Sequence, residues 1–346
     1  MSLATALRAG DVSQLPGKRD EDWRWTDLRG LLRVLPPPSP TSDAVLPAGP
    51  FDGLGEAEIA VVNGQVRGDA GALVLSAGER RRVRLRFVSL SEATSHGASL
   101  TVALGEGAEL TLLESYEGYA AGYVADASLD IRLGEGARLE RIVVAADAPD
   151  AVSVSTAHVS LAATAELAQT VLADGARRQR LETRVSHPGA GASVRLDAAY
   201  LLQDQRHADL TTAVEHLGVD GATSQLAKGV VKDQSRGVFQ GRIIVAEGAD
   251  RTDARMGHHA LILSDRAEID ARPELLIFAD DVQCAHGNTI GALDEDALFY
   301  MRQRGLPQAE ARALLIEAFV GEVVDRIAHE SARELAAAWV AQRLRT

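Results

Sequence analysis

Residues 98–110 read ASLTVALGEGAEL, and residues 127–139 read ASLDIRLGEGARL. Nine positions are identical at one constant offset, so that Ala98 recurs as Ala127, and a weaker third copy follows at residues 161–167. Aliphatic residues alternate with other residues in each copy, as in LTVAL and LDIRL, which is typical of a strand with one buried face. The Gly-Glu-Gly-Ala segment that follows predicts a sharp turn.

The repeat favours a fold in which similar units stack. A strand–turn–strand unit of this length cannot bury its inner face alone, but it can stack on its neighbours. We therefore predict a mainly β protein whose core, residues 56–292, is a parallel β-helix. An antiparallel sandwich of hairpins is the alternative, because short alternating strands serve both folds. The low aromatic content of 4% suits stacked strands that are filled with small aliphatic side chains.

Two other regions precede this predicted core. Residues 1–35 combine helical patterns with a charged and aromatic run, KRDEDWRW. Residues 36–55 are rich in proline, which fixes φ and removes a hydrogen-bond donor. We therefore expect a small N-terminal helical region that is joined to the core by an extended linker.

Residues 293–346 return to helical spacing, and we predict three helices there. Asp294 can cap the first helix, Gly305 can take the left-handed position that ends it, and Pro307 can open the second. The second helix has an apolar stripe at spacings of three and four. Such a stripe is typical of packing against the chain's own body, and a partner-binding face is the alternative.

The overall charge and hydropathy disfavour several classes of protein. A formal charge of −13 and a pI near 5.2 argue against nucleic acid and anionic membranes as partners, because both require clusters of cations. No run approaches the roughly 20 apolar residues that span a bilayer, and the first residues do not resemble a secretory signal. Cys284 is the only cysteine, so no internal disulfide can form, and we expect a cytoplasmic protein.

Cys284 and His286 are the strongest candidates for chemistry. They are separated by a single residue, so on a strand they point to the same face, where a thiolate and an imidazole can share one soft metal. His258 precedes His286 by nearly the length of one repeat, which predicts that it stacks on an adjacent rung and adds a ligand. The alternative is structural, with Cys284 as a small buried hydrophobe and His286 bonded to the backbone.

The sequence contains no motif for nucleotide hydrolysis or for a catalytic triad. It lacks a G-x-x-x-x-G-K-[ST] loop, and its Gly-Glu-Gly turns precede strands, whereas a Rossmann fingerprint precedes a helix. We therefore expect that the chain does not hydrolyse nucleotide itself. The alternative is a polysaccharide-active β-helix enzyme that uses the carboxylates of Asp280, Asp281 and Asp204 together with Arg206.

Further groups of residues form a pattern that extends over both ends and the middle of the chain. Within residues 228–327 they are Lys228, Gly237, Val238, Phe239, Gly241, Val245, Thr252, Asp253, Ala267, Glu268, Ile269, Asp270, Pro273, Leu275, residues 279–287, Phe299, Tyr300, Arg302, Arg304 and Gly305. Near the N-terminus they are Arg19, Glu21, Trp23, Arg24 and Thr26. This pattern resembles the SufB/SufD family of iron–sulfur cluster assembly proteins. The C-x-H-G pattern at Cys284, His286 and Gly287 is similar to the SufD side of that family, because SufB carries a cysteine and glutamate arrangement there.

The resemblance implies a right-handed parallel β-helix with helical ends that acts as a non-catalytic scaffold of the SUF system. It implies that His286, together with Cys284, lies at an interface with SufB, where transient iron or a nascent cluster is completed by a SufB cysteine. No tightly bound cofactor is expected in the isolated chain, which can form a homodimer when SufB is absent. The resemblance also implies that the C-terminal helices dock on the ATPase SufC. The residues that we assign to this contact are Phe299, Tyr300, Arg302, Arg304, Leu315 and Phe319.

Overall fold

The computed structural model describes residues 1–68, 71–187 and 189–344. Its ten-stranded sheet contains β1 (Ala57–Val62), β2 (Gln65–Val66), β4 (Arg80–Ser89), β6 (Glu109–Gly118), β8 (Arg138–Ala146), β10 (Glu166–Ala173), β12 (Ser193–Leu202), β14 (Ala222–Val231), β16 (Thr252–Ile262) and β18 (Val282–Gly291). Its eight-stranded sheet contains β3 (Ala72–Leu75), β5 (Ser95–Leu104), β7 (Val124–Leu133), β9 (Val152–Leu161), β11 (Arg178–His187), β13 (His207–His216), β15 (Arg236–Val245) and β17 (Glu268–Ile277). The helical elements are α1 (Leu3–Ala9), η1 (Val12–Gln14), η2 (Glu21–Trp23), α2 (Leu28–Leu31), α3 (Glu295–Gln303), α4 (Gln308–Val324) and α5 (Glu330–Leu344).

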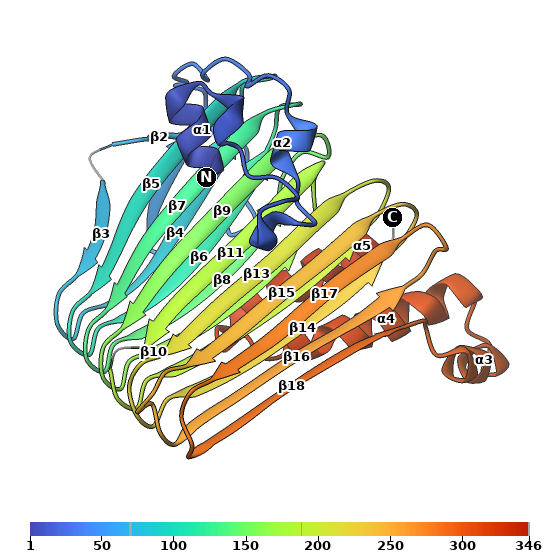
Figure 1. The fold of residues 1–346 in the computed structure, drawn as a ribbon. Helices are drawn as coiled ribbons and strands as arrows, with labels where there is room; N and C mark the ends of the chain where they lie inside the picture. The colour runs from blue at the N-terminus through green and yellow to red at the C-terminus, as the bar shows by residue number, and fades with distance from the viewer. Residues whose placement is uncertain (69–70, 188, 345–346) are drawn as a thin grey trace.

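The two sheets form a parallel β-helix (Figure 1). From β3 to β18 the chain alternates between the sheets, so each pair of successive strands makes one coil. Neighbouring strands within a sheet run parallel, apart from the antiparallel pair of β1 and β2. The predicted fold class is therefore confirmed, and the antiparallel sandwich is wrong.

The repeat in the sequence corresponds to the register of the coils. β5 and β7 pair so that Ala98 lies beside Ala127 and Leu104 lies beside Leu133, which are the pairs of positions that recur in the sequence. The weaker third copy continues the same row, because Leu133 lies beside Leu161 of β9. Equivalent residues of successive coils therefore stack on one another and share one face.

The glycines of the Gly-Glu-Gly turn are required for two different reasons. Gly107 has a φ of +61°, and its N–H donates to the carbonyl of Glu135 in the next turn, at 2.8 Å. Such a positive φ is strained for most other residues. A Cβ on Gly134 would lie 2.9 Å from the carbonyl carbon of Gly105, so stacked turns approach too closely for a side chain. The turns therefore form a hydrogen-bonded column of their own.

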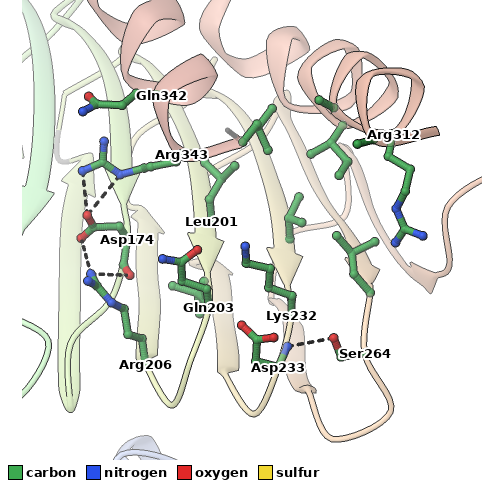
Figure 2. A pocket seen from close by; sticks show the side chains of 17 residues that line it. Asp174, Leu201, Gln203, Arg206, Lys232, Asp233, Ser264, Arg312, Gln342 and Arg343 are labelled. Atoms are coloured by element: carbon green, nitrogen blue, oxygen red, sulfur yellow. Dashed lines mark hydrogen bonds and ion pairs between the residues drawn. The ribbon is translucent and has the colours of Figure 1, made fainter. Parts of the chain in front are cut away.

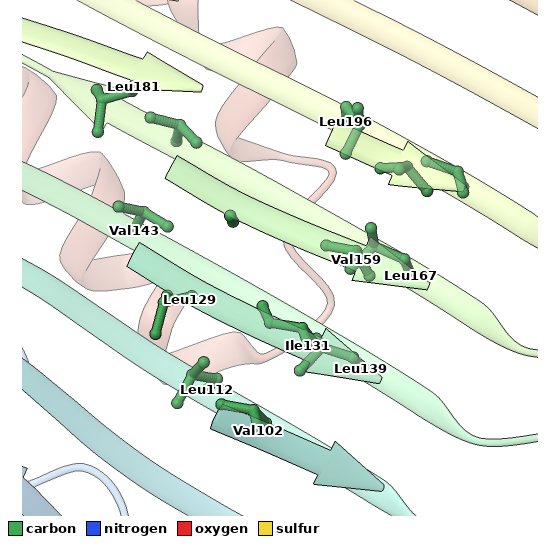
Figure 3. Packing of buried hydrophobic residues seen from close by; sticks show 14 of the residues in the cluster. Val102, Leu112, Leu129, Ile131, Leu139, Val143, Val159, Leu167, Leu181 and Leu196 are labelled. Atoms are coloured by element: carbon green, nitrogen blue, oxygen red, sulfur yellow. The ribbon is translucent and has the colours of Figure 1, made fainter. Parts of the chain in front are cut away.

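Aliphatic side chains of both sheets fill the interior (Figure 3). Leu129 and Ile131 of β7 and Val143 of β8 are each exposed by 1% or less. A buried ion pair lies among them, because Arg141 donates to both carboxylate oxygens of Glu114 at 2.6 and 2.7 Å. A paired and hydrogen-bonded charge can be buried where an isolated one cannot.

The N-terminal elements α1 to α2 dock on the outer face of the eight-stranded sheet (Figure 1). Arg180 of β11 is fully buried there, with its guanidinium carbon 4.4 Å from the ring centre of Trp23. Nη1 of Arg180 lies 2.6 Å from Oδ2 of Asp209, and the hydroxyl of Thr26 donates to the same carboxylate. Charges on the outer face of the sheet therefore anchor this region.

The helices α4 and α5 cover the outer face of the ten-stranded sheet (Figure 1). Ile316, Val323 and Val340 are buried against a strand surface that includes Leu201, and Phe51 of the proline-rich segment joins the same cluster. The apolar stripe of the second C-terminal helix therefore packs against the chain's own body. Among the described residues, none of the helices combines the length and the apolar character that a membrane crossing requires.

Two glycines leave space for the ring of Tyr200 inside the last coils. A Cβ on Gly229 would lie 2.1 Å from Cζ of Tyr200, and a Cβ on Gly237 would lie 2.4 Å from its Cε2. Tyr200 is 0% exposed, so its ring cannot move out to solvent. The ring therefore reaches past β14 toward the following coil.

We expect Gly229→Ala to lower the free energy of unfolding by about 1–3 kcal/mol, which is the usual range for overpacking a core. Urea-induced unfolding followed by circular dichroism would measure the change. The matched control is Gly97→Ala in β5, where the nearest atom lies 3.8 Å from the added Cβ and where replacing a strand glycine is neutral or favourable. Equal stability of the two variants would contradict the packing of Tyr200.

Candidate functional site

The last coil of the β-helix presents its inner side chains to solvent. β17 and β18 are the final strands of their sheets, so no further coil covers them. Ile277 and Ile290 continue inner rows whose preceding members, Val245 and Ala260, are buried, yet they are 41% and 43% exposed. The end of the solenoid is therefore an open surface with an apolar rim.

Cys284 and His286 share the inner face of β18. Cys284 lies beside Ala254 and His286 lies beside Met256, and both of these neighbours belong to the interior cluster. Cys284 is half-buried against that cluster, and burial raises the pKa of its thiol, so the thiol is neutral at pH 7. His286 is exposed on the open side.

These two side chains make at most half of a metal site. Thiolate and imidazole ligands suit zinc, copper and iron–sulfur clusters, and such sites require about four ligands. Over residues 1–68, 71–187 and 189–344, no group of three or more His, Cys, Asp or Glu side chains could hold a metal ion.

His258 lies on the adjacent rung but not beside His286. In the pairing of β16 with β18, Met256 is the neighbour of His286, and His258 is the neighbour of Asn288. The expected stacking of His258 on His286 is therefore wrong, because this coil is longer than the sequence repeat. Nε2 of His258 lies 2.9 Å from Oη of Tyr200, and its Nδ1 lies 2.7 Å from Oδ1 of Asn288. Both ring nitrogens of His258 are thus engaged within the chain.

The packing of His258 explains why its ring is neutral. It is fully buried and stacks on Phe239 with a centroid separation of 4.7 Å. Burial lowers the pKa of His258 to about 4. A neutral imidazole can donate from Nδ1 to Asn288 and accept the hydroxyl of Tyr200 at Nε2. The hydrogen bonds from Tyr200 through His258 to Asn288 therefore connect the interior to the inner face of β18.

Our sequence interpretation missed Tyr200 and Asn288. Asn288 could have been found, because it continues the alternation of Cys284 and His286 on one strand. Tyr200 carries no such signal. Its role depends on the space beside Gly229, which becomes visible only when the strands are paired.

The carboxylates of the polysaccharide-enzyme alternative lie far apart in the fold. Asp204 and Arg206 lie in the turn from β12 to β13, whereas Asp280 and Asp281 lie in the turn from β17 to β18. The first turn leads out of the ten-stranded sheet and the second leads back into it, so they are at opposite corners of the β-helix. Nη1 of Arg206 instead lies 3.6 Å from Oδ1 of Asp174. These residues do not form the acid–base pair that such an enzyme needs.

The α3 residues assigned to a partner are exposed. Phe299 and Tyr300 are 62% and 57% exposed, and Arg302 and Arg304 are exposed beside them. Nη2 of Arg304 donates to Oη of Tyr300 at 2.6 Å, and its guanidinium carbon lies 4.7 Å from the centre of that ring. Figure 1 shows α3 beyond the edge of the sheets, beside the first end of α4. An aromatic and cationic surface is therefore available on this helix.

The α4 residues assigned to the same partner are turned partly toward the chain itself. Leu315 and Phe319 are half-buried against the cluster that joins α4 to the ten-stranded sheet. The ammonium nitrogen of Lys228 lies 4.4 Å from the ring centre of Phe319 and 2.6 Å from Oε2 of Glu322. Phe319 is thus held by a cation–π contact within the chain.

Comparison with known proteins identifies a family that fits this architecture. The model for the SufBD core domain of SUF system FeS cluster assembly matches residues 87–319. The SufD protein of Escherichia coli K12 is 32% identical over 246 residues, which cover 70% of this chain and 57% of that relative. A SufBD family protein of Synechocystis is 31% identical over 66% of this chain and 52% of its own length. A SufBD family protein of Mycobacterium bovis is 27% identical over 94% of this chain and 88% of its own length.

The chain thus spans about half the length of the E. coli and Synechocystis relatives. The family match begins within β4, covers the rest of the β-helix including the open last coil, and ends within α4. The resemblance noted from the residues is therefore confirmed. The chain belongs to the SufBD family of iron–sulfur cluster assembly proteins of the SUF system.

Proposed function

We propose that this chain is a SufD-type scaffold subunit of a SUF complex. It pairs with SufB through its last coil, binds the ATPase SufC through its C-terminal helices, and helps to acquire iron and build a nascent cluster at the SufB interface. The observation that carries this proposal is the half-site of Cys284 and His286 on an open coil. The chain itself is non-catalytic and cytoplasmic in this proposal, and ATP hydrolysis belongs to SufC.

The unpaired edges of β17 and β18 support pairing with SufB. An edge strand has free N–H and C=O groups that can pair with a strand of another chain. Phe278 is 65% exposed beside these edges, and Ile277 and Ile290 add apolar area on the open face. Burial of such a rim favours association. The same edges can pair two copies of this chain when SufB is absent.

The chemistry of the half-site supports transient binding of iron or of a cluster as cargo. His286 is the more accessible ligand, and its imidazole binds without charge. Cys284 must first lose its proton, which its partial burial opposes, so metal binding and deprotonation are coupled there. A SufB cysteine would complete the coordination. Binding that needs two chains is easily reversed when SufC shifts the SufB/SufD pair.

The exposed face of α3 supports docking of SufC. Aromatic residues and arginine are the residue types that contribute most at protein interfaces. The hydrogen bond from Arg304 to Tyr300 holds this pair in one arrangement before a partner arrives, which reduces the entropy lost on binding. Arg302 and Phe299 widen the surface, and Leu315 and Phe319 support it from α4.

We expect His286→Ala to reduce iron retention and cluster formation in the purified SufB–SufC–SufD complex by about tenfold or more, since even outer-shell changes cost 10–100-fold in metal affinity. Iron and acid-labile sulfide per complex would be measured, with the subunit ratio checked by gel filtration. The matched control is His158→Ala, which removes an exposed histidine of β9. Full iron and sulfide content in the His286 variant would rule out the proposed role.

We expect Phe299→Asp to reduce the amount of SufC that copurifies with this chain by tenfold or more, because a central aromatic residue contributes about 2 kcal/mol or more to an interface. Val45→Asp is the control, because it places the same charge on a side chain that is 94% exposed elsewhere. Unchanged far-ultraviolet circular dichroism would show that the β-helix stays folded. If the double variant Phe299→Asp/Tyr300→Asp retained SufC, the docking surface would lie elsewhere.

A further inference from the structure

A cavity of about 560 Å³ lies between α4, the end of α5 and the outer face of the ten-stranded sheet, at the ends of β12 and β14 (Figure 2). Leu201 and Val230 form its floor, and Ile316 and Ala313 of α4 form its apolar wall. The cavity is on the outer face of the sheet, whereas Cys284 and His286 of the last coil lie on the inner face. It is therefore separate from the proposed cluster site.

The sequence of α4 explains why a cavity forms here. Ala309, Arg312, Ala313 and Ile316 lie on one face of the helix, and two of these four side chains are single methyl groups. One turn further along, Val320 is fully buried against the sheet. The first half of α4 thus spans the sheet without filling the space beneath it.

The lining of the cavity has an excess of positive charge. Its cations are Arg206, Lys232, Arg312 and Arg343, and its carboxylates are Asp174 and Asp233. Asp174 is shared by two of the cations, because Arg343 Nη2 lies 2.7 Å and Arg206 Nη1 lies 3.6 Å from its oxygens. In a chain with a formal charge of −13, most of the surface repels anions, whereas this local excess of cations attracts them.

Two of these cations have no counter-charge. In the part of the chain that the structure describes, the side chains of Lys232 and Arg312 make neither an ion pair nor a hydrogen bond, and both are half-buried. Figure 2 shows Lys232 in the middle of the cavity and Arg312 on α4 at its far side, with the two charged groups apart from each other. A half-buried cation with no counter-charge in the chain can form a charge-assisted contact with a bound anion, and Lys232 is the cation at the centre of the cavity.

We infer that this cavity binds a small amphiphilic anion, which has an apolar body and one carboxylate, sulfonate or phosphate group. The apolar body lies on Leu201, Val230 and Ile316, the anionic group is bound by Lys232, and Arg312 adds positive charge at the far side of the cavity. The volume falls within the range of roughly 300–1,000 Å³ that is typical of small-molecule sites, and the combination of apolar walls with a few polar groups is also typical. This site requires neither SufB nor SufC.

The probe for this site is 8-anilinonaphthalene-1-sulfonate, and its neutral analogue N-phenyl-1-naphthylamine has the same rings without the sulfonate. Fluorescence titration of the full chain would measure the affinity and stoichiometry of both dyes. We expect one sulfonate dye per chain in this site, with an affinity at least tenfold above that of the neutral dye. We also expect the difference to shrink as salt concentration rises.

The variants test separately how the two cations and the space of the cavity contribute to dye binding. Lys232→Gln/Arg312→Gln should weaken binding of the sulfonate dye by tenfold or more and leave the neutral dye nearly unchanged. The control Arg266→Gln removes an exposed cation from the neighbouring turn and should change neither dye. Ala313→Trp fills the cavity and should weaken both dyes, whereas dye bound at the open last coil would be unaffected.

Two outcomes would overturn the inference. One is equal affinity of the sulfonate dye for the parent chain and for the Lys232→Gln/Arg312→Gln variant. The other is equal affinity of the parent chain for the two dyes, which would mean that the cavity, or another apolar surface, binds rings without regard to charge. Circular dichroism would check that each variant is folded. If Ala313→Trp did not fold, the charge variants would still decide the question.

Discussion

Main-chain hydrogen bonding from coil to coil is the constraint on which this molecule depends. A strand of a parallel β-helix has no partner within its own coil, so its N–H and C=O groups are satisfied only by neighbouring coils. The turns follow the same rule, since Gly107 donates to Glu135 of the next turn. The last coil necessarily ends in unpaired strands. Cys284 and His286 lie on such a strand, so the proposed half-site and the free edge have the same origin.

The fold could be predicted because the offset of the sequence repeat equals the offset between paired residues of neighbouring coils. The register of the last coil could not be predicted, because the coils differ in length. The coil that pairs Ala222 with Asp253 is longer than the coil that pairs Thr252 with Val282, and both are longer than the repeat that pairs Ala98 with Ala127. Such a difference decides which inner side chain lies beside His286. The common face of Cys284 and His286 was predictable, since alternation within one strand does not depend on coil length.

Contacts between distant parts of the chain could not be predicted from the sequence. Alternation assigns Arg180 to the outer face of its strand, where a charged residue is expected to be solvated. Only the docking of Trp23 and Thr26 buries it, together with Asp209. The same holds for Phe319 on α4, whose stripe identifies a contact face but does not identify its partner. Burial on outer faces is decided by which segments cover them, and the periodicity of one element does not contain that information.

From β4 to β18 the strands of the β-helix are nearly uniform in length, whereas its corners differ. β5, β6 and β15 have the same length, yet the corner between β15 and β16, at 246–251, is longer than the corner between β5 and β6, at 105–108. A residue inserted within a strand would exchange its inner and outer faces, whereas one inserted at a corner exchanges none. Evolution can therefore lengthen or shorten such a chain at its corners, one residue at a time, without rebuilding its core.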